Sequence, residues 1–252
     1  RRARTRADAL TLLRAQGLDD AEIGALLAQL PEQGLLRSRA DGVAWQALQL
    51  RGAAPTELRI GSRQLGAQAG ALEILVRSPD REGLFAAIVA TLDRLGLAIQ
   101  RARLFDGPAG TVVDMFEVVP GEGRAAVAPA DVDQRLRGAL AQPDLDAIRP
   151  TRRTQPRHLR HFRIPPRIDV SEANGRSVLG IVCTDRPGLL ADIARVLREQ
   201  RLQVHEARIA TFGERAEDQF QVSDEHGRPL RDDPQRQALR DALLAAIDGE
   251  TA

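Results

Sequence analysis

The apolar and polar positions of the chain describe two units with the same order of elements. Each unit begins with an apolar run of strand length that contains β-branched residues, at 71–78 and at 177–184. An amphipathic helix follows, and in the second unit its apolar face is formed by Leu189, Ile193, Val196 and Leu197. Two strands joined by a glycine-containing turn come next, and a second helix closes the unit. Each unit therefore has the pattern β-α-β-β-α.

The later elements of each unit carry their own boundary signals. Residues 202–211 alternate between apolar and polar positions, and a slip near His205 predicts a β-bulge. The closing helices are expected at 129–142 and 233–248, with Pro234 in the first turn of the latter.

The two units are copies of one module. Residues 78–105 align with 183–210 at an offset of 105 without a gap, and after a one-residue deletion 113–118 aligns with 217–222. This many matches at one offset indicate a duplication. The matched residues of the turn before the first helix are Asp80, Arg81, Gly83 and Leu84 in the first copy and Asp185, Arg186, Gly188 and Leu189 in the second.

A split βαβ sandwich has four antiparallel strands with two helices on one face, so one more strand is needed in each copy. We expect residues 57–64 and 166–173, which precede the two copies at similar distances, to form edge strands in that place. The expected fold class is α+β, with two tandem ferredoxin-like domains of the βαββαβ type. The expected boundaries are 56–150 for the first domain, 151–165 for a connector with a possible strand at 158–164, and 166–249 for the second domain.

The N-terminal residues 1–52 have a different pattern, with amphipathic helices expected at 6–17, 19–30 and 38–52. They are too few to form a large core of their own. We expect them to pack either on the two modules or on a further domain.

The composition of the chain argues against several classes of protein. The chain has 36 basic and 35 acidic residues, and this balance argues against a dedicated nucleic-acid binder. Its one cysteine, Cys183, excludes an internal disulfide framework, fits a reducing cytoplasm, and is expected to be a buried small apolar residue. No apolar run reaches the length of a membrane span, and no signal-peptide pattern is present, so no membrane association is expected.

The turn before the first helix has two interpretations. In the structural one, Asp185 caps the helix by accepting hydrogen bonds from free backbone N–H groups, and Pro187 occupies the first turn. In the functional one, the helix N-terminus offers N–H donors to a ligand carboxylate, Gly188 allows close approach, and Asp185 takes an amino group.

The sequence Asp185-Arg186-Pro187-Gly188-Leu189-Leu190, placed between a strand and a helix, resembles the ACT family of small-molecule sensing modules. Two such modules in tandem, with HFRIPPRI between them and AWQALQLRG before them, resemble the C-terminal region of the family of bifunctional PII uridylyltransferase/uridylyl-removing enzymes. The resemblance implies a ligand site between two modules, glutamine as effector, and a role in nitrogen regulation. Glu82 in place of proline and Gln46 in place of histidine depart from the family pattern.

The resemblance also implies what lies outside this sequence. The Ser-Asp-x-Asp and His-Asp motifs of that family's transfer and hydrolysis sites do not occur here, so no catalytic or metal-binding residue is expected in the chain. Residues 1–52 would be the tail of a hydrolase domain, Mg²⁺ would serve the catalytic domains, and the PII protein would be the parent enzyme's substrate. Two alternatives remain open: a free-standing sensor of another amino acid, and an oligomerisation module that binds nothing.

Two further clusters are given ordinary structural interpretations. His158 and His161 are expected in an exposed basic connector and not at a metal site. Asp218, Asp224 and Glu225 are interpreted as the solvated end of a hairpin.

Overall fold

The computed structural model describes residues 2–31, 39–66, 70–150 and 164–248. Its helices are α1 (Arg2–Ala15), α2 (Asp20–Leu27), α4 (Ala40–Gln49), α5 (Leu84–Arg94), α6 (Pro129–Leu140), α7 (Leu189–Glu199) and α8 (Asp233–Asp248), with short 3-10 turns η1 (Pro108–Gly110) and η2 (Leu145–Ala147). Its strands are β1 (Arg59–Gln64), β2 (Leu72–Pro79), β3 (Leu97–Asp106), β4 (Thr111–Pro120), β5 (Arg167–Ala173), β6 (Arg176–Thr184), β7 (Gln203–Phe212) and β8 (Arg215–Ser223).

The fourth strand of each module comes from the segment that precedes the copy in sequence, as predicted. β1 pairs with β2 and β5 pairs with β6, both antiparallel, and Ile168 of β5 lies opposite Ile181. Each module thus has four antiparallel strands although its chain ends on a helix. Of the strand candidate in the connector, residues 158–163 lie outside the described residues, and Ile164 lies in no strand.

The two modules join edge to edge in one eight-stranded sheet of order β1-β2-β4-β3-β7-β8-β6-β5. At the junction of β3 with β7, Ala102 lies opposite Ala207, and these two residues occupy the same position in the two copies. Antiparallel pairing of equivalent residues relates the modules by an approximate two-fold axis. A strand at the edge of a sheet has backbone N–H and C=O groups without partners. Here the edge strands β3 and β7 form hydrogen bonds with each other.

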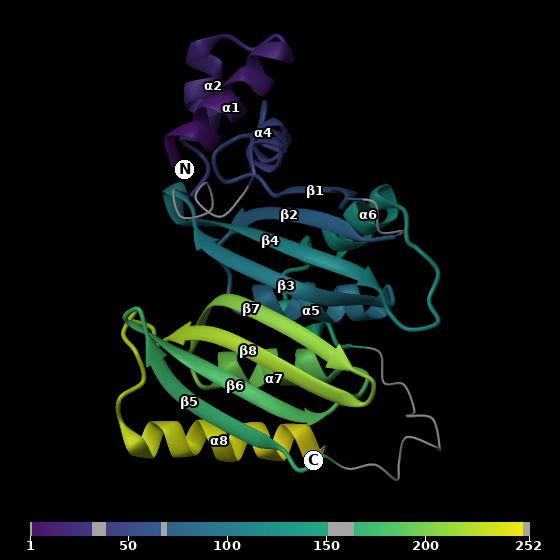
Figure 1. The fold of residues 1–252 in the computed structure, drawn as a ribbon, viewed down its shortest axis with the longest axis vertical. Helices are drawn as coiled ribbons and strands as arrows, with labels where there is room; N and C mark the ends of the chain where they lie inside the picture. The colour runs from purple at the N-terminus through teal and green to yellow at the C-terminus, as the bar shows by residue number, and fades with distance from the viewer. Residues whose placement is uncertain (1, 32–38, 67–69, 151–163, 249–252) are drawn as a thin grey trace.

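The helices of both modules cover the same face of this sheet (Figure 1). Below them lies one continuous apolar core in which Phe116 and Phe220, again at matched positions, are both fully buried. Helices α5 and α7 contact each other across the junction, so the modules meet through helices as well as strands. The predicted β-bulge is confirmed between Val204 and Glu206.

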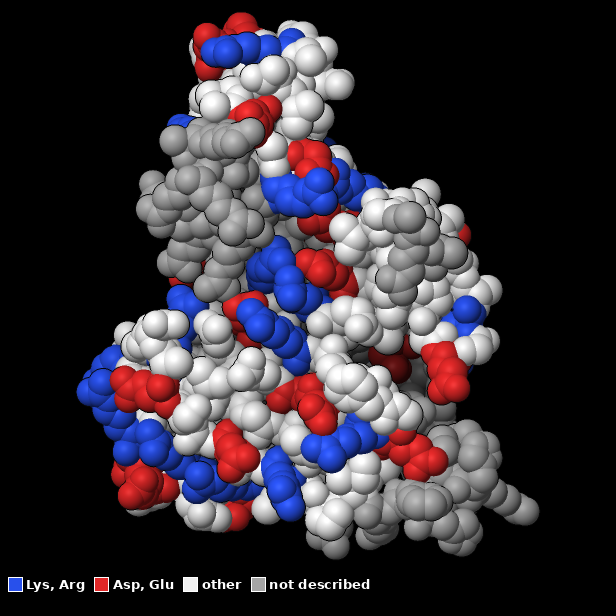
Figure 2. Space-filling view, viewed as in Figure 1, with Lys and Arg blue, Asp and Glu red and all other residues white. Residues whose placement is uncertain are grey.

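The opposite face of the sheet differs between the modules. Helices α1, α2 and α4 lie over the first module (Figure 1), and their core includes Leu75, Val113 and Met115 from its strands. The N-terminal helices therefore pack on the first module, one of the two expected arrangements. On the second module none of the described helices covers this face, and Figure 2 shows acidic and basic side chains scattered over it.

Within the described residues, no helix is long and apolar enough to cross a membrane.

Candidate functional site

The Asp-Arg-x-Gly turns, called lip 1 (residues 80–83) and lip 2 (residues 185–188), have the same backbone at the helix start. Gly83 has φ 79° and ψ 0°, and Gly188 has φ 79° and ψ −2°. Each glycine is the N-cap residue of the following helix, and its left-handed conformation disfavours any residue with a side chain. Glu82 in place of proline therefore leaves the conformation of the lip glycine unchanged.

The capping interpretation of lip 2 is wrong in detail. Helix α7 begins at Leu189, so Pro187 precedes the N-cap instead of lying in the first turn. The N-cap residue of each helix is a glycine, which has no side chain to cap the helix, and the carboxylate of Asp185 accepts a hydrogen bond from the backbone N–H of Arg186. The first turns of α5 and α7 consequently present backbone N–H groups that no side-chain cap occupies.

The guanidinium groups of the two lip arginines bind the C-terminal ends of the second helices. The guanidinium of Arg81 donates to three carbonyl oxygens at and just past the end of α6. That of Arg186 donates to two carbonyl oxygens at the end of α8 and pairs with Asp192 at 2.7 Å. A helix leaves its last carbonyls without partners, so these arginines act as structural caps. The acceptors are Leu140 at 2.8 Å, Gln142 at 2.6 Å and Pro143 at 2.9 Å for Arg81, and Ala246 at 2.6 Å and Ile247 at 3.3 Å for Arg186.

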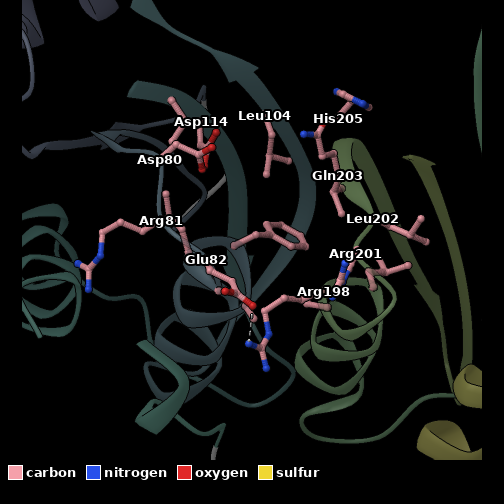
Figure 3. Close-up of a pocket in the computed structure, with 18 of the residues that line it drawn as sticks. Asp80, Arg81, Glu82, Leu104, Asp114, Arg198, Arg201, Leu202, Gln203 and His205 are labelled. Atoms are coloured by element: carbon pink, nitrogen blue, oxygen red, sulfur yellow. Dashed lines mark hydrogen bonds and ion pairs between the residues drawn. The ribbon is translucent and has the colours of Figure 1, made fainter. Parts of the chain in front are cut away.

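Each lip forms one wall of a cavity whose other wall comes from the other module. Cavity 1, of about 580 Å³, lies between lip 1, β3 and β4 on one side and the end of α7 with the start of β7 on the other (Figure 3). Cavity 2, of about 250 Å³, lies between lip 2, β7 and β8 on one side and the end of α5 with the start of β3 on the other. Small-molecule sites typically measure about 300–1,000 Å³, so cavity 1 falls in that range and cavity 2 just below it.

All eight predicted site residues line these two cavities. Their contributions differ, because Leu84 and Leu189 are 5% and 4% exposed and belong mainly to the core. The lip aspartates Asp80 and Asp185 and the helix starts behind the lip glycines are the parts that face the open space.

Two buried aspartates that were not predicted also line the cavities. Asp114 of β4 lies in cavity 1 and is 2% exposed, and Asp218 of β8 lies in cavity 2 and is 4% exposed. The interpretation of Asp218 as part of a solvated hairpin end is therefore wrong. The signal was available in the strand period: Asp218 alternates with the core residues Phe220 and Val222, so all three share the buried face.

The environments of these two carboxyls are alike. In each, one oxygen, Oδ1, has no hydrogen-bond partner among the described residues. Burial, followed by the charges of Asp80 and Asp106, raises the pKa of Asp114 well above its usual range, despite a hydrogen bond from the Phe105 backbone. Burial and the charge of Asp185 raise the pKa of Asp218 to about 7. Each cavity thus contains a buried carboxyl facing a lip carboxyl.

The remaining sequence predictions have simple outcomes. Cys183 is fully buried, as predicted, and burial raises the pKa of its thiol to about 12, which makes it unreactive at neutral pH. Asp224 is bound by the backbone and side chain of Arg228 in its own turn. His158 and His161 lie outside the described residues. In the part of the chain that the structure describes, no group of three or more His, Cys, Asp or Glu residues could hold a metal ion.

The sequence of the chain is similar to part of several known enzymes. A bifunctional uridylyltransferase/uridylyl-removing enzyme of Xanthomonas campestris (strain B100) is 52% identical over 245 residues, which is 96% of this chain and 28% of the relative. The enzyme of the same description from Chromobacterium violaceum is 37% identical over 243 residues, 93% of this chain and 28% of its own. The chain is homologous to the C-terminal part of the bifunctional uridylyltransferase/uridylyl-removing enzymes.

Family profiles match the two ends of the chain. The profile described as "Uridylyltransferase GlnD fifth domain" matches residues 1–49, and "Plant bHLH transcription factor, ACT-like domain" matches residues 167–248. The first match covers the N-terminal helices and the second covers the second module. Because the chain spans only 28% of the length of these uridylyltransferase relatives, the activity of a whole enzyme of that family does not transfer to it directly.

A crystal structure of an unknown protein from Galdieria sulphuraria covers 76% of this chain and 94% of its own at 13% identity. Its TM-score of 0.24 is too low to carry an argument. The homology and the ACT-like match together support a regulatory role for the chain.

Proposed function

We propose that this chain is the amino-acid-sensing regulatory region of a bifunctional PII uridylyltransferase/uridylyl-removing enzyme, with glutamine as its ligand. The observation that carries the proposal is the pair of cavities between the modules, each lined by a lip and by the opposing module. Sequence homology supplies the catalytic context, and the cavities supply the place for a ligand.

The chemistry of the cavities suits an α-amino acid. The uncapped first turn of α5 or α7 offers backbone N–H groups and the positive end of a helix dipole to a carboxylate. The lip aspartates, Asp80 and Asp185, lie at the same cavities and offer acceptors to an ammonium group. A zwitterion would place its two charges on these two features.

The position of the cavities suits regulation. Each has walls from both modules, so a bound ligand contacts both and favours the arrangement in which the walls fit it best. A ligand shifts an equilibrium only through such differential affinity. Glutamine binding would in this way bias the catalytic domains of the whole enzyme, whose substrate would be the PII protein and whose metal would be Mg²⁺, toward uridylyl removal.

The test is a calorimetric titration of the 252-residue chain with L-glutamine, with L-glutamate as a matched ligand that differs only in the side-chain amide. We expect saturable binding of glutamine and weaker binding of glutamate. At a hundredfold excess over Kd, binding stabilises the folded chain by about 2.7 kcal/mol and raises its Tm. Absence of both heat and Tm shift with glutamine would contradict the proposal, and binding of another amino acid alone would overturn only the identity of the ligand.

A further inference from the structure

The two buried aspartates are the features of the cavities that the fold does not explain. A buried carboxyl without a partner is expensive, and buried polar groups are normally hydrogen-bonded. Asp114 and Asp218 nevertheless each leave Oδ1 without a partner, at the same position of the two copies. In both, a backbone N–H of the neighbouring strand, Phe105 or Ala210, binds the carboxyl. The repetition argues for a shared purpose and against an isolated packing defect.

Each buried carboxyl faces a lip carboxyl across the cavity wall. Asp80 and Asp114 both line cavity 1, and Asp185 and Asp218 both line cavity 2. In each cavity the charge of the lip aspartate raises the pKa of the buried one. Figure 3 shows Asp80 and Asp114 together at one end of cavity 1. Two negative charges in one cavity repel each other, and a cation bound between them would relieve the repulsion.

Among the described residues, no basic side chain that lines cavity 1 forms an ion pair with Asp80 or Asp114. Arg81 points away from the pair (Figure 3) and binds the carbonyl oxygen of Leu140, the last residue of α6. Arg198 lies on the α7 side and pairs with Asp146 at 2.8 Å and Glu82 at 3.4 Å. Burial lowers the pKa of His205 to about 4, so this ring is neutral at pH 7. Arg201 lies beside Arg198 in the view of Figure 3, on the wall opposite the pair.

We propose that Asp114 and Asp218 are the residues that select a ligand with a primary ammonium group, each binding it through the free Oδ1 together with Asp80 or Asp185. This inference rests on the proposed function, because it assigns the amine-recognising groups of the same cavities. The ammonium group donates to both carboxyls, and its positive charge takes the place of the missing partner. A ligand that lacks the amine leaves a buried carboxyl unpaired and binds more weakly.

The first experiment uses the unmodified chain and two ligands, L-glutamine and 4-carbamoylbutanoate, which is glutamine without its α-amino group. Calorimetry is expected to show a Kd for 4-carbamoylbutanoate at least about tenfold higher than for glutamine. Equal affinities overturn the inference whatever the variants do. If neither glutamine nor any other amino acid binds, the proposed function fails and the inference falls with it.

The second experiment uses Asp114→Asn and Asp218→Asn, which keep the shape of the side chain and remove its charge. Each variant is expected to lose at least about tenfold in glutamine affinity at its own cavity while keeping its affinity for 4-carbamoylbutanoate. Asp169→Asn, on the exposed edge strand β5 outside both cavities, is the matched control and should bind as the unmodified chain does. If the Asn variants fold, as thermal melting will show, and still bind glutamine normally, the inference fails while the proposed function stands.

Discussion

Lip 1 and lip 2 have the same conformation at their glycines but are held in place differently. In lip 1, the exposed Glu82 pairs with Arg198 of the other module, and an added Cβ at Gly83 would lie 3.0 Å from Asp146. Lip 2 has Pro187 in place of the glutamate, and an added Cβ at Gly188 would meet only Pro150, at 3.5 Å. Lip 1 therefore has an exposed ion pair across the junction, whereas lip 2 has a proline that restricts the backbone of its own turn.

The comparison teaches that the repeated motif has two separate tasks. Arg81 and Arg186 close the second helix of each module, so they are required by the fold with or without a ligand. The aspartates and the helix starts face the cavities. Conserving one motif in both copies thus does not mean that every residue of it touches a ligand.

The largest loss of stability is expected from replacing the arginine that both lips contain. Arg81→Met removes three hydrogen bonds to carbonyls at and just past the end of α6. Arg186→Met removes the hydrogen bonds to carbonyls at the end of α8 and leaves Asp192 without its closest cation. Each is expected to lower the free energy of unfolding by about 2–3 kcal/mol, because charge-assisted hydrogen bonds are among the stronger ones. Urea denaturation measures this loss.

Arg135→Met, on an exposed position of α6, is the matched control and should change stability by no more than about 0.5 kcal/mol. If Arg81→Met leaves stability unchanged and abolishes ligand binding, the structural role assigned to the arginines is wrong.

The second-largest effect is expected in the pH dependence of stability, through the buried Asp218 of cavity 2. Burial raises the pKa of Asp218 from 3.8 to about 7, so the folded chain keeps a proton that the unfolded chain releases. Its contribution to stability should therefore fall as pH rises from about 4 to about 7, and Asp218→Asn should remove the part of the pH dependence that Asp218 causes. The variant is expected to match the unmodified chain below about pH 4 and to exceed it by about 1–3 kcal/mol at pH 8.

Asp224→Asn is the control for this pH series, because the pKa of Asp224 is lowered whereas that of Asp218 is raised. Hydrogen bonds from the backbone of Arg228 lead the effects that lower the pKa of Asp224. Its contribution to stability is present at neutral pH and is lost as the pH falls through its lowered pKa. Identical pH profiles for Asp218→Asn and the unmodified chain would show that the buried carboxyl is not strained in the folded state.

A smaller difference should separate the two lip glycines. Gly83→Ala and Gly188→Ala both force a side chain into a left-handed conformation, at about 1 kcal/mol or more. Gly83→Ala should be the more destabilising of the two because its Cβ also displaces Asp146. Gly138→Ala, within helix α6 with open space around its Cβ, should instead stabilise by about 0.5–1 kcal/mol. Thermal melting of the three variants ranks them, and equal losses at both lips would remove the distinction.

The smallest change in stability is expected at residue 82, where lip 1 has glutamate and lip 2 has proline. Glu82 is 82% exposed in its pair with Arg198, so Glu82→Ala should change stability by less than about 0.5 kcal/mol. A double-mutant cycle with Arg198→Ala measures the pair directly. A coupling above about 1 kcal/mol would show that this ion pair holds the modules together.

The sequence by itself determined the modules and their elements. The match of residues 78–105 to 183–210 identified the duplication, and strand and helix periods placed the elements, including the edge strands β1 and β5. These features are local or repetitive, so a pattern along the chain contains them. The same pattern led to the lip residues, and the cavities do form around them.

The tertiary structure alone decided what each lip residue does. Arg81 and its acceptor Leu140 are 59 residues apart, so no local signal could show that the arginine caps a distant helix. The cavities exist only because β3 pairs with β7 and brings the end of each module's first helix to the other module's lip. Asp218 sits on the buried face of β8 and lacks a partner because of what packs around it. Periodicity records which face a residue occupies, whereas charge pairing and cavity walls depend on contacts between segments far apart in the chain.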